Sequence, residues 1–402
     1  MFQRRNLSTL TRVLAATASV ALLGPALTAC EGEPSAATND SQASAEKPTV
    51  PPLKLSTGFR KPNAVPVDQA VRLSAEGGTL RAVKVTSPAG PLPGKLAKND
   101  KSWIASGRLE PGVTYRIHYV GTRSDGKKVV RNTRFRTEDL TLDEQTYASV
   151  APLSGETVGV GMPVIVTFDV PVTDKASIEK HMSVTSSPRQ PGSWHWLSDQ
   201  EAHFRPRTYW KPGSEVAVDV DINSIPAGAG IYGQESRHVE FDVGDSIVSR
   251  VNVETHRMKV FINGSLARTI PVSAGKKGWE TRSGTKVIIE KHRKKRMNAA
   301  TIGVDRDDPE YYNLNNVEYA LRVTYSGEFL HAAPWSVGDQ GSANVSHGCV
   351  GMSTSDAAWL YNLTLRGDVV EVTGTERYME PGNGYADWNK SFAEYRSGSA
   401  LS

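Results

Sequence analysis

The sequence has few cysteines, no large excess of charge of either sign and little helical periodicity. Its two cysteines, Cys30 and Cys349, provide no disulfide framework, because each lies in a local context that uses it differently. The formal net charge of +4 over 402 residues is small. It argues against nucleic acid as the main partner, although it would not oppose approach to an anionic envelope. The best candidate for a helix runs from Ser355 to Leu363, with Ser353 or Ser355 as its N-cap.

Turn-forming residues are abundant instead. The chain has 35 glycines and 23 prolines, which favours turn-rich β structure over helix bundles. Segments such as 79–85, 115–120 and 164–168 alternate with a period of two and are rich in Val, Ile, Tyr and Thr, which is typical of strands. A chain of 402 residues exceeds what one hydrophobic core usually organises, so two or three domains are expected.

The N-terminus has the pattern of an export signal. A basic start leads into an apolar run too short to span a membrane comfortably, and the run ends in Leu27-Thr28-Ala29-Cys30. These four residues resemble the bacterial lipobox, which implies that residues 1–29 are removed and that lipid chains are attached to Cys30. Two or more chains give stable anchoring, here at the outer face of the cell membrane. A plain signal peptide with an incidental cysteine is the alternative. Residues 30–52 are polar and are expected to form a disordered tether.

A weak internal repeat follows the tether. Residues 109–117 and 210–218 both place Pro-Gly before an alternating strand, and the two Pro-Gly pairs lie about 100 residues apart, close to the length of an immunoglobulin-like sandwich. We therefore expect two Ig-like modules, at 53–140 and 141–245. A third β-rich segment contains Asn263-Gly264 between alternating runs, which is a strong hairpin signal. We expect the modules to act as spacers; binding to wall polymers is the alternative.

Chemistry concentrates around Cys349. His347 precedes it by two residues, and on an extended strand both side chains would leave the same face. His331 lies 18 residues upstream of Cys349, far enough for a loop to return it beside the thiol. A thiol becomes a strong nucleophile when a neighbouring group takes its proton. From the residues alone, a metal site and a small buried cysteine remain open alternatives.

The spacing of His331 and the motif Ser346-His347-Gly348-Cys349 resemble the signature of the YkuD-type L,D-transpeptidases. The resemblance extends through Val251-Asn252-Val253, the Asn263-Gly264 hairpin, 270–275, 279–284 and 325–327, and a tail containing 387–389. It implies a mainly β chain with two Ig-like sandwich modules and a β-rich catalytic domain at 246–375, with a short helix after the nucleophile. Residues 376–402 would form an extension that packs back on the catalytic domain.

The resemblance also implies a reaction. Cys349 would attack the carbonyl between residues three and four of a peptidoglycan tetrapeptide stem, D-alanine would leave, and an amine of another stem would resolve the thioester into a 3→3 crosslink. No cofactor or metal is implied, and acylation of the thiol by carbapenems is expected. Implied roles are His331 as general base, the N–H groups of Gly348 and Cys349 as oxyanion donors, and His347 ordering the loop. The residues implied to line the cleft or contact substrate are Met297, Tyr312, Trp335, Asn344 and Ser346.

Two positions depart from the family pattern. Ala332 stands where relatives often carry Ser, and Gly351 stands where Asn or Arg is usual. The first change is tolerable if this position orients His331 through its backbone carbonyl; the second puts a polar substrate contact in doubt. Two alternatives to transpeptidation follow: an L,D-carboxypeptidase or other cysteine peptidase, in which water resolves the thioester, and a wall-binding lipoprotein with a degenerate site.

Overall fold

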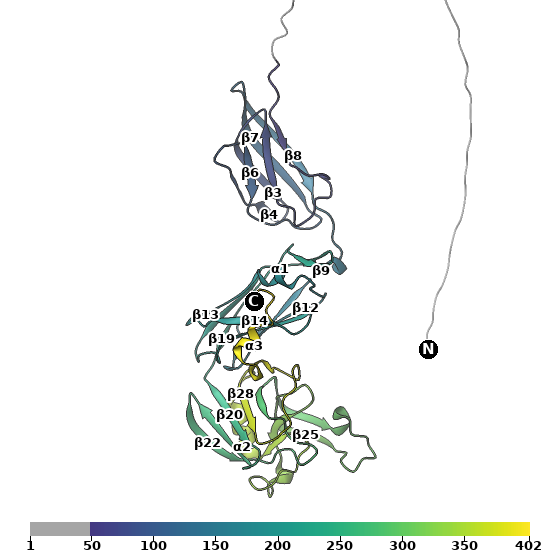
Figure 1. The fold of residues 1–402 in the computed structure, drawn as a ribbon, viewed down its shortest axis with the longest axis vertical. Helices are drawn as coiled ribbons and strands as arrows, with labels where there is room; N and C mark the ends of the chain where they lie inside the picture. The colour runs from purple at the N-terminus through teal and green to yellow at the C-terminus, as the bar shows by residue number, and fades with distance from the viewer. Residues whose placement is uncertain (1–48) are drawn as a thin grey trace, which may run out of the picture. The chain divides into compact units, whose positions relative to one another are not determined.

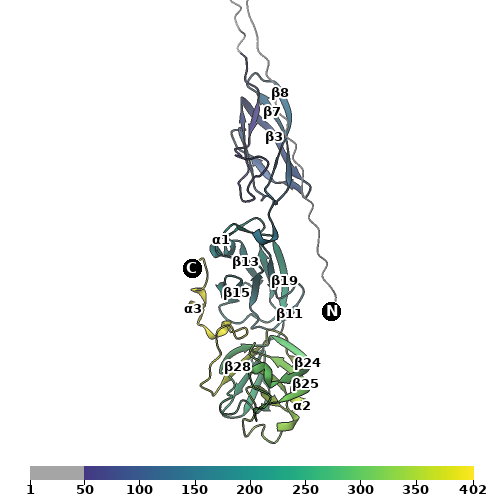
Figure 2. The same cartoon turned by 90° about the vertical axis from the view of Figure 1, so that its right-hand side faces the viewer.

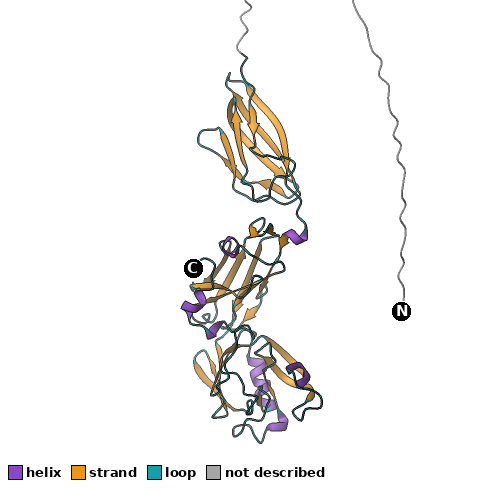
Figure 3. Cartoon of the chain, turned by 45° about the vertical axis from the view of Figure 1, so that its right-hand side comes forward, coloured by secondary structure: helices purple, strands orange, loops and turns teal. Residues whose placement is uncertain are grey.

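The structure is a computed structural model that describes residues 49–402. The predicted signal peptide, the lipidation of Cys30 and nearly all of the predicted tether lie outside the described residues. Strands predominate over helices along the described chain, which confirms the mainly β prediction (Figure 3). No helix between residues 49 and 402 is both long enough and apolar enough to cross a membrane.

The first Ig-like module consists of two four-stranded antiparallel sheets, in the orders β1-β2-β6-β5 and β4-β3-β7-β8 (Figure 1). Alternating apolar residues from both sheets form one core, in which Leu73 and Trp103 of one sheet meet Tyr115 and Phe135 of the other. The strands are β1 (Lys54–Ser56), β2 (Arg72–Glu76), β3 (Gly78–Ser87), β4 (Gly90–Leu92), β5 (Gly94–Leu96), β6 (Ser102–Ala105), β7 (Thr114–Arg123) and β8 (Lys128–Arg136).

The second Ig-like module again has two four-stranded sheets, in the orders β10-β12-β15-β14 and β11-β19-β16-β13, with a small sheet β17-β18-β9 beside them. Its elements are η1 (Leu142–Glu144), β9 (Gln145–Thr146), β10 (Ala148–Ala151), β11 (Thr157–Val158), β12 (Val164–Phe168), α1 (Lys175–Glu179), β13 (Met182–Ser187), β14 (Gly192–Trp196), β15 (Glu201–Pro206), β16 (Glu215–Val220), β17 (Pro226–Gly228), β18 (Ile231–Gly233) and β19 (Arg237–Val243).

The repeat seen in the sequence corresponds to equivalent turns in the two modules. Gly112 and Gly213 both adopt positive φ angles, +67° and +71°, which glycine accepts at no steric cost. Each turn leads into a central strand, β7 in the first module and β16 in the second. The modules are joined by a bidentate pair in which Arg108 donates to both carboxylate oxygens of Asp221, at 2.9 and 2.7 Å.

The catalytic domain has two sheets, β22-β21-β20-β28-β23 and β24-β25-β26-β27. Asn263 and Gly264 form the expected hairpin turn with φ angles of +47° and +82°. The predicted helix is α2, and Ser353 caps it by accepting from the Asp356 N–H. The elements are β20 (Ile247–Asn252), β21 (Arg257–Ile262), β22 (Ser265–Pro271), β23 (Gly284–Val287), β24 (Glu290–Asn298), η2 (Ala299–Ile302), β25 (Asn313–Arg322), β26 (Phe329–Ala332), η3 (Pro334–Ser336), β27 (Val350–Met352), α2 (Thr354–Leu363) and β28 (Val369–Thr373).

The C-terminal extension contacts two domains rather than the catalytic domain alone. Ser283 of the catalytic domain donates to the Arg377 carbonyl at 2.7 Å and accepts from the Met379 N–H at 2.9 Å, and η4 (Asp387–Asn389) lies against β23. The final helix, α3 (Phe392–Arg396), packs instead on β14 of the second module (Figure 1), and Figure 2 shows α3 beside that module. Its Tyr395 stacks on His195, and Tyr395 is buried, so apolar and aromatic surface on the second module accounts for this docking.

Candidate active site

Two neighbouring parallel strands bring the predicted nucleophile and base together. In the β26–β27 pair, His331 lies opposite Gly351, and Cys349 immediately precedes β27. Side chains two residues apart on a strand share a face, so Cys349 and His331 are diagonal neighbours on one side of the sheet. Both line one cavity of about 290 Å³. The other residues of its wall are Ser273, Met297, Tyr312, Leu314, Ala333, Trp335, Ser336, Val345, Ser346, His347 and Gly351.

The imidazole of His331 is held in one tautomer. Its Nδ1 lies 2.7 Å from the carbonyl oxygen of Ala332, and because a carbonyl only accepts, Nδ1 must carry the proton. The lone pair is therefore on Nε2, as a general base requires. The orienting group is a backbone atom, so the alanine at position 332 does not remove it. Trp335 stacks on the ring at 5.8 Å between centroids. Burial lowers the pKa of His331, although the bond to Ala332 opposes this.

The surroundings of Cys349 disfavour its thiolate. Cys349 is the free cysteine of the described chain, and its Sγ lies 3.7 Å from the carbonyl oxygen of Gly327. Burial raises its pKa to about 12, and the charge of Glu328 adds to this, while a backbone bond from Phe329 and the charge of Lys286 act in the opposite direction. A neighbouring base is therefore needed to generate the nucleophile.

The segment before Cys349 is not the extended strand that the sequence analysis assumed. Gly348 adopts a φ of +116°, which bends the chain and separates the directions of the side chains on either side of it. His347 consequently points to the segment between η2 and β25 (residues 303–312), where its Nε2 lies 2.7 Å from Oε2 of Glu310. Lys276 pairs with the same oxygen at 2.5 Å, and Trp279 and Tyr312 contact the ring.

Two predicted substrate contacts have other partners here. The amide of Asn344 is engaged by the Ala274 N–H at 2.9 Å and by the Val253 carbonyl at 3.1 Å, and Asn344 does not line the cavity. It therefore holds the loop rather than facing substrate, a correction that follows from its use of both amide atoms. The N–H of Gly348, expected to be an oxyanion donor, instead donates to Ser346 Oγ at 3.1 Å. The hydroxyl of Ser346 in turn donates to the carbonyl of Cys349 at 2.6 Å.

The remaining predicted cleft residues lie in the cavity wall. Trp335 is 57% exposed at its rim, whereas Met297 on β24 is buried. Tyr312 lies in the segment before β25, and burial raises its pKa to about 12 with a further contribution from Cys349. Met297 and Tyr312 also line a second hollow, whose wall includes Lys295, Arg296 and Arg322.

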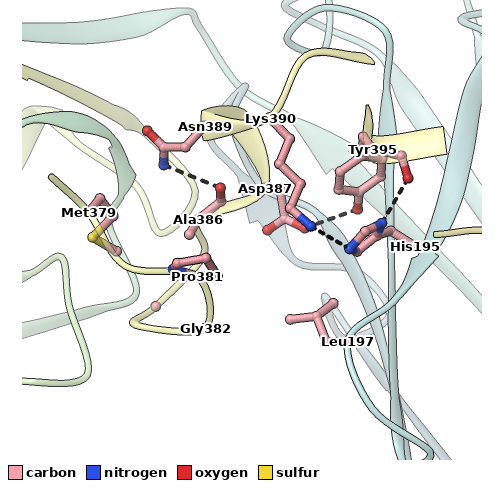
Figure 4. Close-up of a pocket in the computed structure, with 11 residues that line it drawn as sticks. His195, Leu197, Met379, Pro381, Gly382, Ala386, Asp387, Asn389, Lys390 and Tyr395 are labelled. Carbon is pink, nitrogen blue, oxygen red and sulfur yellow. Dashed lines mark hydrogen bonds between the residues drawn. The ribbon is translucent and has the colours of Figure 1, made fainter. Parts of the chain in front are cut away.

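Another cavity lies away from the predicted nucleophile, where the extension meets the second module. In Figure 4, the Lys390 side chain reaches His195 on β14, and the Tyr395 hydroxyl reaches the buried carboxylate of Asp387. Its wall includes neither Cys349 nor either histidine of the first cavity. Within residues 49–402, no group of three His, Cys, Asp or Glu side chains is placed to hold a metal ion.

Comparisons with known proteins agree with the fold. A model of the L,D-transpeptidase catalytic domain, YkuD, matches residues 246–372, and a model of a bacterial Ig domain matches residues 62–226. L,D-transpeptidase 2 of Mycobacterium tuberculosis (strain CDC 1551 / Oshkosh) is 34% identical over 338 residues, which cover 84% of this chain and 82% of the relative. L,D-transpeptidase 1 of M. tuberculosis (strain ATCC 25618 / H37Rv) is 36% identical over 227 residues, 56% of this chain and 84% of the relative.

A solved structure of the LD transpeptidase LdtMt1 in complex with imipenem aligns with a TM-score of 0.50 and 36% identity, covering 56% of this chain and 98% of the other. Fold, catalytic-domain match and relatives together define an enzyme of the acyltransferase type. The chain belongs to the L,D-transpeptidase family, as the resemblance predicted.

Proposed function

We propose that the protein crosslinks peptidoglycan stems 3→3 through a thioester on Cys349. The observation that carries this proposal is the shared cavity of Cys349 and His331, with the His331 lone pair on Nε2. Because burial raises the pKa of the thiol to about 12, the thiolate is a small minority at pH 7, so proton removal has to accompany attack.

One base, His331, can carry out every proton transfer in this reaction. His331 Nε2 takes the Sγ proton as sulfur bonds to the carbonyl carbon of stem residue three. The imidazolium then gives the proton to the nitrogen of the departing D-alanine as the C–N bond breaks. When an amine of a second stem attacks the thioester, His331 accepts its proton and returns it to sulfur as the C–S bond breaks. The Cys349 N–H is the proposed donor to the oxyanion, because the Gly348 N–H is engaged with Ser346.

A reaction with a tetrapeptide stem tests this proposal. Products are identified by mass spectrometry after incubating the protein with a disaccharide tetrapeptide, and the expected product is a dimer that has lost one D-alanine. Tripeptide alone, with no dimer, would instead identify an L,D-carboxypeptidase. A Cys349→Ala control should yield neither product.

Carbapenems provide a second probe of the same thiol. A relative's structure holds imipenem, and a covalent carbapenem adduct on Cys349 is expected by intact-mass measurement. Cys349→Ala should abolish the adduct. His331→Ala should abolish acylation, because the Ala332 carbonyl orients this imidazole as the base. His347→Ala should only weaken acylation, because His347 bonds to Glu310. The reverse order for the two histidines would exchange their roles.

Anchoring at the outer face of the cell membrane through lipid on Cys30 is part of the proposal. It is supported by Leu27-Thr28-Ala29-Cys30 after an apolar run. Labelling cells with a fatty-acid analogue should modify the protein, and Cys30→Ala should remain unlabelled. Equal labelling of both proteins would contradict the anchor.

A further inference from the structure

A set of buried charges lies beneath the nucleophile loop and has no part in the proton transfers described above. Lys286 on β23 pairs with Oε2 of Glu328, and their side chains are 1% and 5% exposed. Arg282 donates to Oε1 of Glu328 from both its backbone N–H, at 3.1 Å, and its guanidinium, at 2.9 Å. The catalytic domain therefore encloses one anion between two cations.

Burying such an ion pair in a core costs free energy. Each ion loses its hydration, and apolar residues of similar volume often stabilise a fold as well or better. Stability alone is thus a weak reason for the pair. Its position beside the nucleophile is a stronger one.

Glu328 and its neighbours in the chain lie against the loop that carries the thiol. A Cβ placed on Gly348, the residue before Cys349, would lie 3.6 Å from Cγ and Oε1 of Glu328. Gly327, the residue before Glu328, presents its carbonyl to the Cys349 Sγ at 3.7 Å. Thr281, next to Arg282, donates from Oγ1 to the Gly348 carbonyl at 2.8 Å. The charges and the nucleophile are consequently held by the same short segments.

We propose that Lys286 and Glu328 are positioning residues for the acyl transfer proposed above: they fix the loop that carries Cys349 and set the electrostatic potential at its sulfur with opposing signs. The groups that face the thiol come from four elements, namely Lys286 on β23, Glu328 and His331 at β26, Tyr312 before β25, and His347 on the nucleophile loop itself. Glu328 raises the pKa of Cys349 and Lys286 lowers it, after the larger effect of burial.

Opposite signs make the proposal testable without substrate. The rate of iodoacetamide alkylation of the Cys349-containing peptide would be measured between pH 7 and 10 in the full chain, because the rate follows the thiolate fraction. Glu328→Gln should move the pH profile to lower pH and Lys286→Met to higher pH, each by about one unit, or about tenfold in rate at fixed pH. In Glu328→Gln, loss of the charge of the unpaired Lys286 would reduce the shift to lower pH.

Matched variants separate charge from packing. Lys286→Arg and Glu328→Asp keep each charge and should stay close to the parent profile. If a neutral single variant does not fold, the double variant Lys286→Met/Glu328→Gln is measured instead, because it leaves neither of these charges unpaired. Because the two charges act on the thiol with opposite signs, the profile of the double variant should lie between those of the two single variants.

Shifts of both single variants in the same direction, or a folded double variant displaced from the parent by more than about one unit, would overturn the proposal. These outcomes are independent of the crosslinking assay. A protein that released only tripeptide would refute transpeptidation and leave the alkylation profiles unaffected.

Discussion

The docking of the C-terminal extension on the second module should depend on pH through one buried pair. His203 on β15 places Nδ1 2.9 Å from Oδ1 of Asp387, which also accepts from the Tyr395 hydroxyl at 3.0 Å. Burial opposes protonation of His203, but the charge and hydrogen bond of Asp387, with help from Glu201, outweigh it and raise the pKa from 6.5 to about 9. Burial likewise opposes ionisation of Asp387, yet His203 holds its pKa below the usual value.

The size of the effect follows from the His203 shift. From 6.5 to about 9 is about 2.5 units, which corresponds to about 3 kcal/mol of folding free energy. Because the pKa is raised in the folded state, this stabilisation is fully present below pH 6.5 and is lost as the pH rises through 9. The same interaction is also lost in acid, because Asp387 becomes protonated as the pH falls through its lowered pKa, below the ordinary carboxyl range.

Asp387→Asn tests this reasoning, because the amide keeps the shape and removes the charge. Calorimetric unfolding at pH 6 and pH 9.5 should show a destabilisation of about 3 kcal/mol at the lower pH and much less at the higher. Asp219→Asn is the matched control: Asp219 contacts His238 at 2.7 Å, but these side chains are 50% and 56% exposed, so little change is expected. An equal cost of Asp387→Asn at both pH values would refute the electrostatic account.

Three further substitutions probe the loop around Cys349. Thr281→Val leaves the buried Gly275 N–H and the Gly348 carbonyl without their partner, so urea unfolding should report a loss of about 1–3 kcal/mol, with slower carbapenem acylation. Ala332→Ser should change the acylation rate little, because the backbone carbonyl already orients His331; a large gain would show that a hydroxyl is needed. Gly351→Asn places a Cβ 2.8 Å from that of Ala333 and should cost about 1–3 kcal/mol on thermal unfolding, with Ala333→Gly relieving it.

Local chemistry explains which features the sequence predicted. The Asn263-Gly264 hairpin, the cap of α2 and the two Pro-Gly turns each depend on residues adjacent in the chain, so their signals are complete within a few positions. The pairing of His331 with the Cys349 strand was predicted only because the spacing matches a known family. Nothing in the residues between them specifies a parallel register.

Features that depend on distant partners were not predicted. Glu328 and Lys286 are 42 positions apart, and Glu310 and His347 are 37 apart. Glu328 follows a Tyr-Ser-Gly turn, where an exposed carboxylate would be the ordinary expectation, and only the fold shows that it is buried. The extended path assumed for residues 347–349 was wrong for a related reason, since the φ of Gly348 depends on contacts from the 281 and 328 segments.

The second module is packed against the catalytic domain. Its apolar core continues into the catalytic domain through Val248, Val287 and Val369, so the two domains share buried surface. The extension adds a second connection, because Glu380 binds Arg282 at 2.5 Å while Asp387 binds His203 of the module. Arg282 also holds Glu328 beneath Cys349. Loosening the extension from the module should therefore release one support of the nucleophile loop as well, which makes the module part of the structure that positions the thiol.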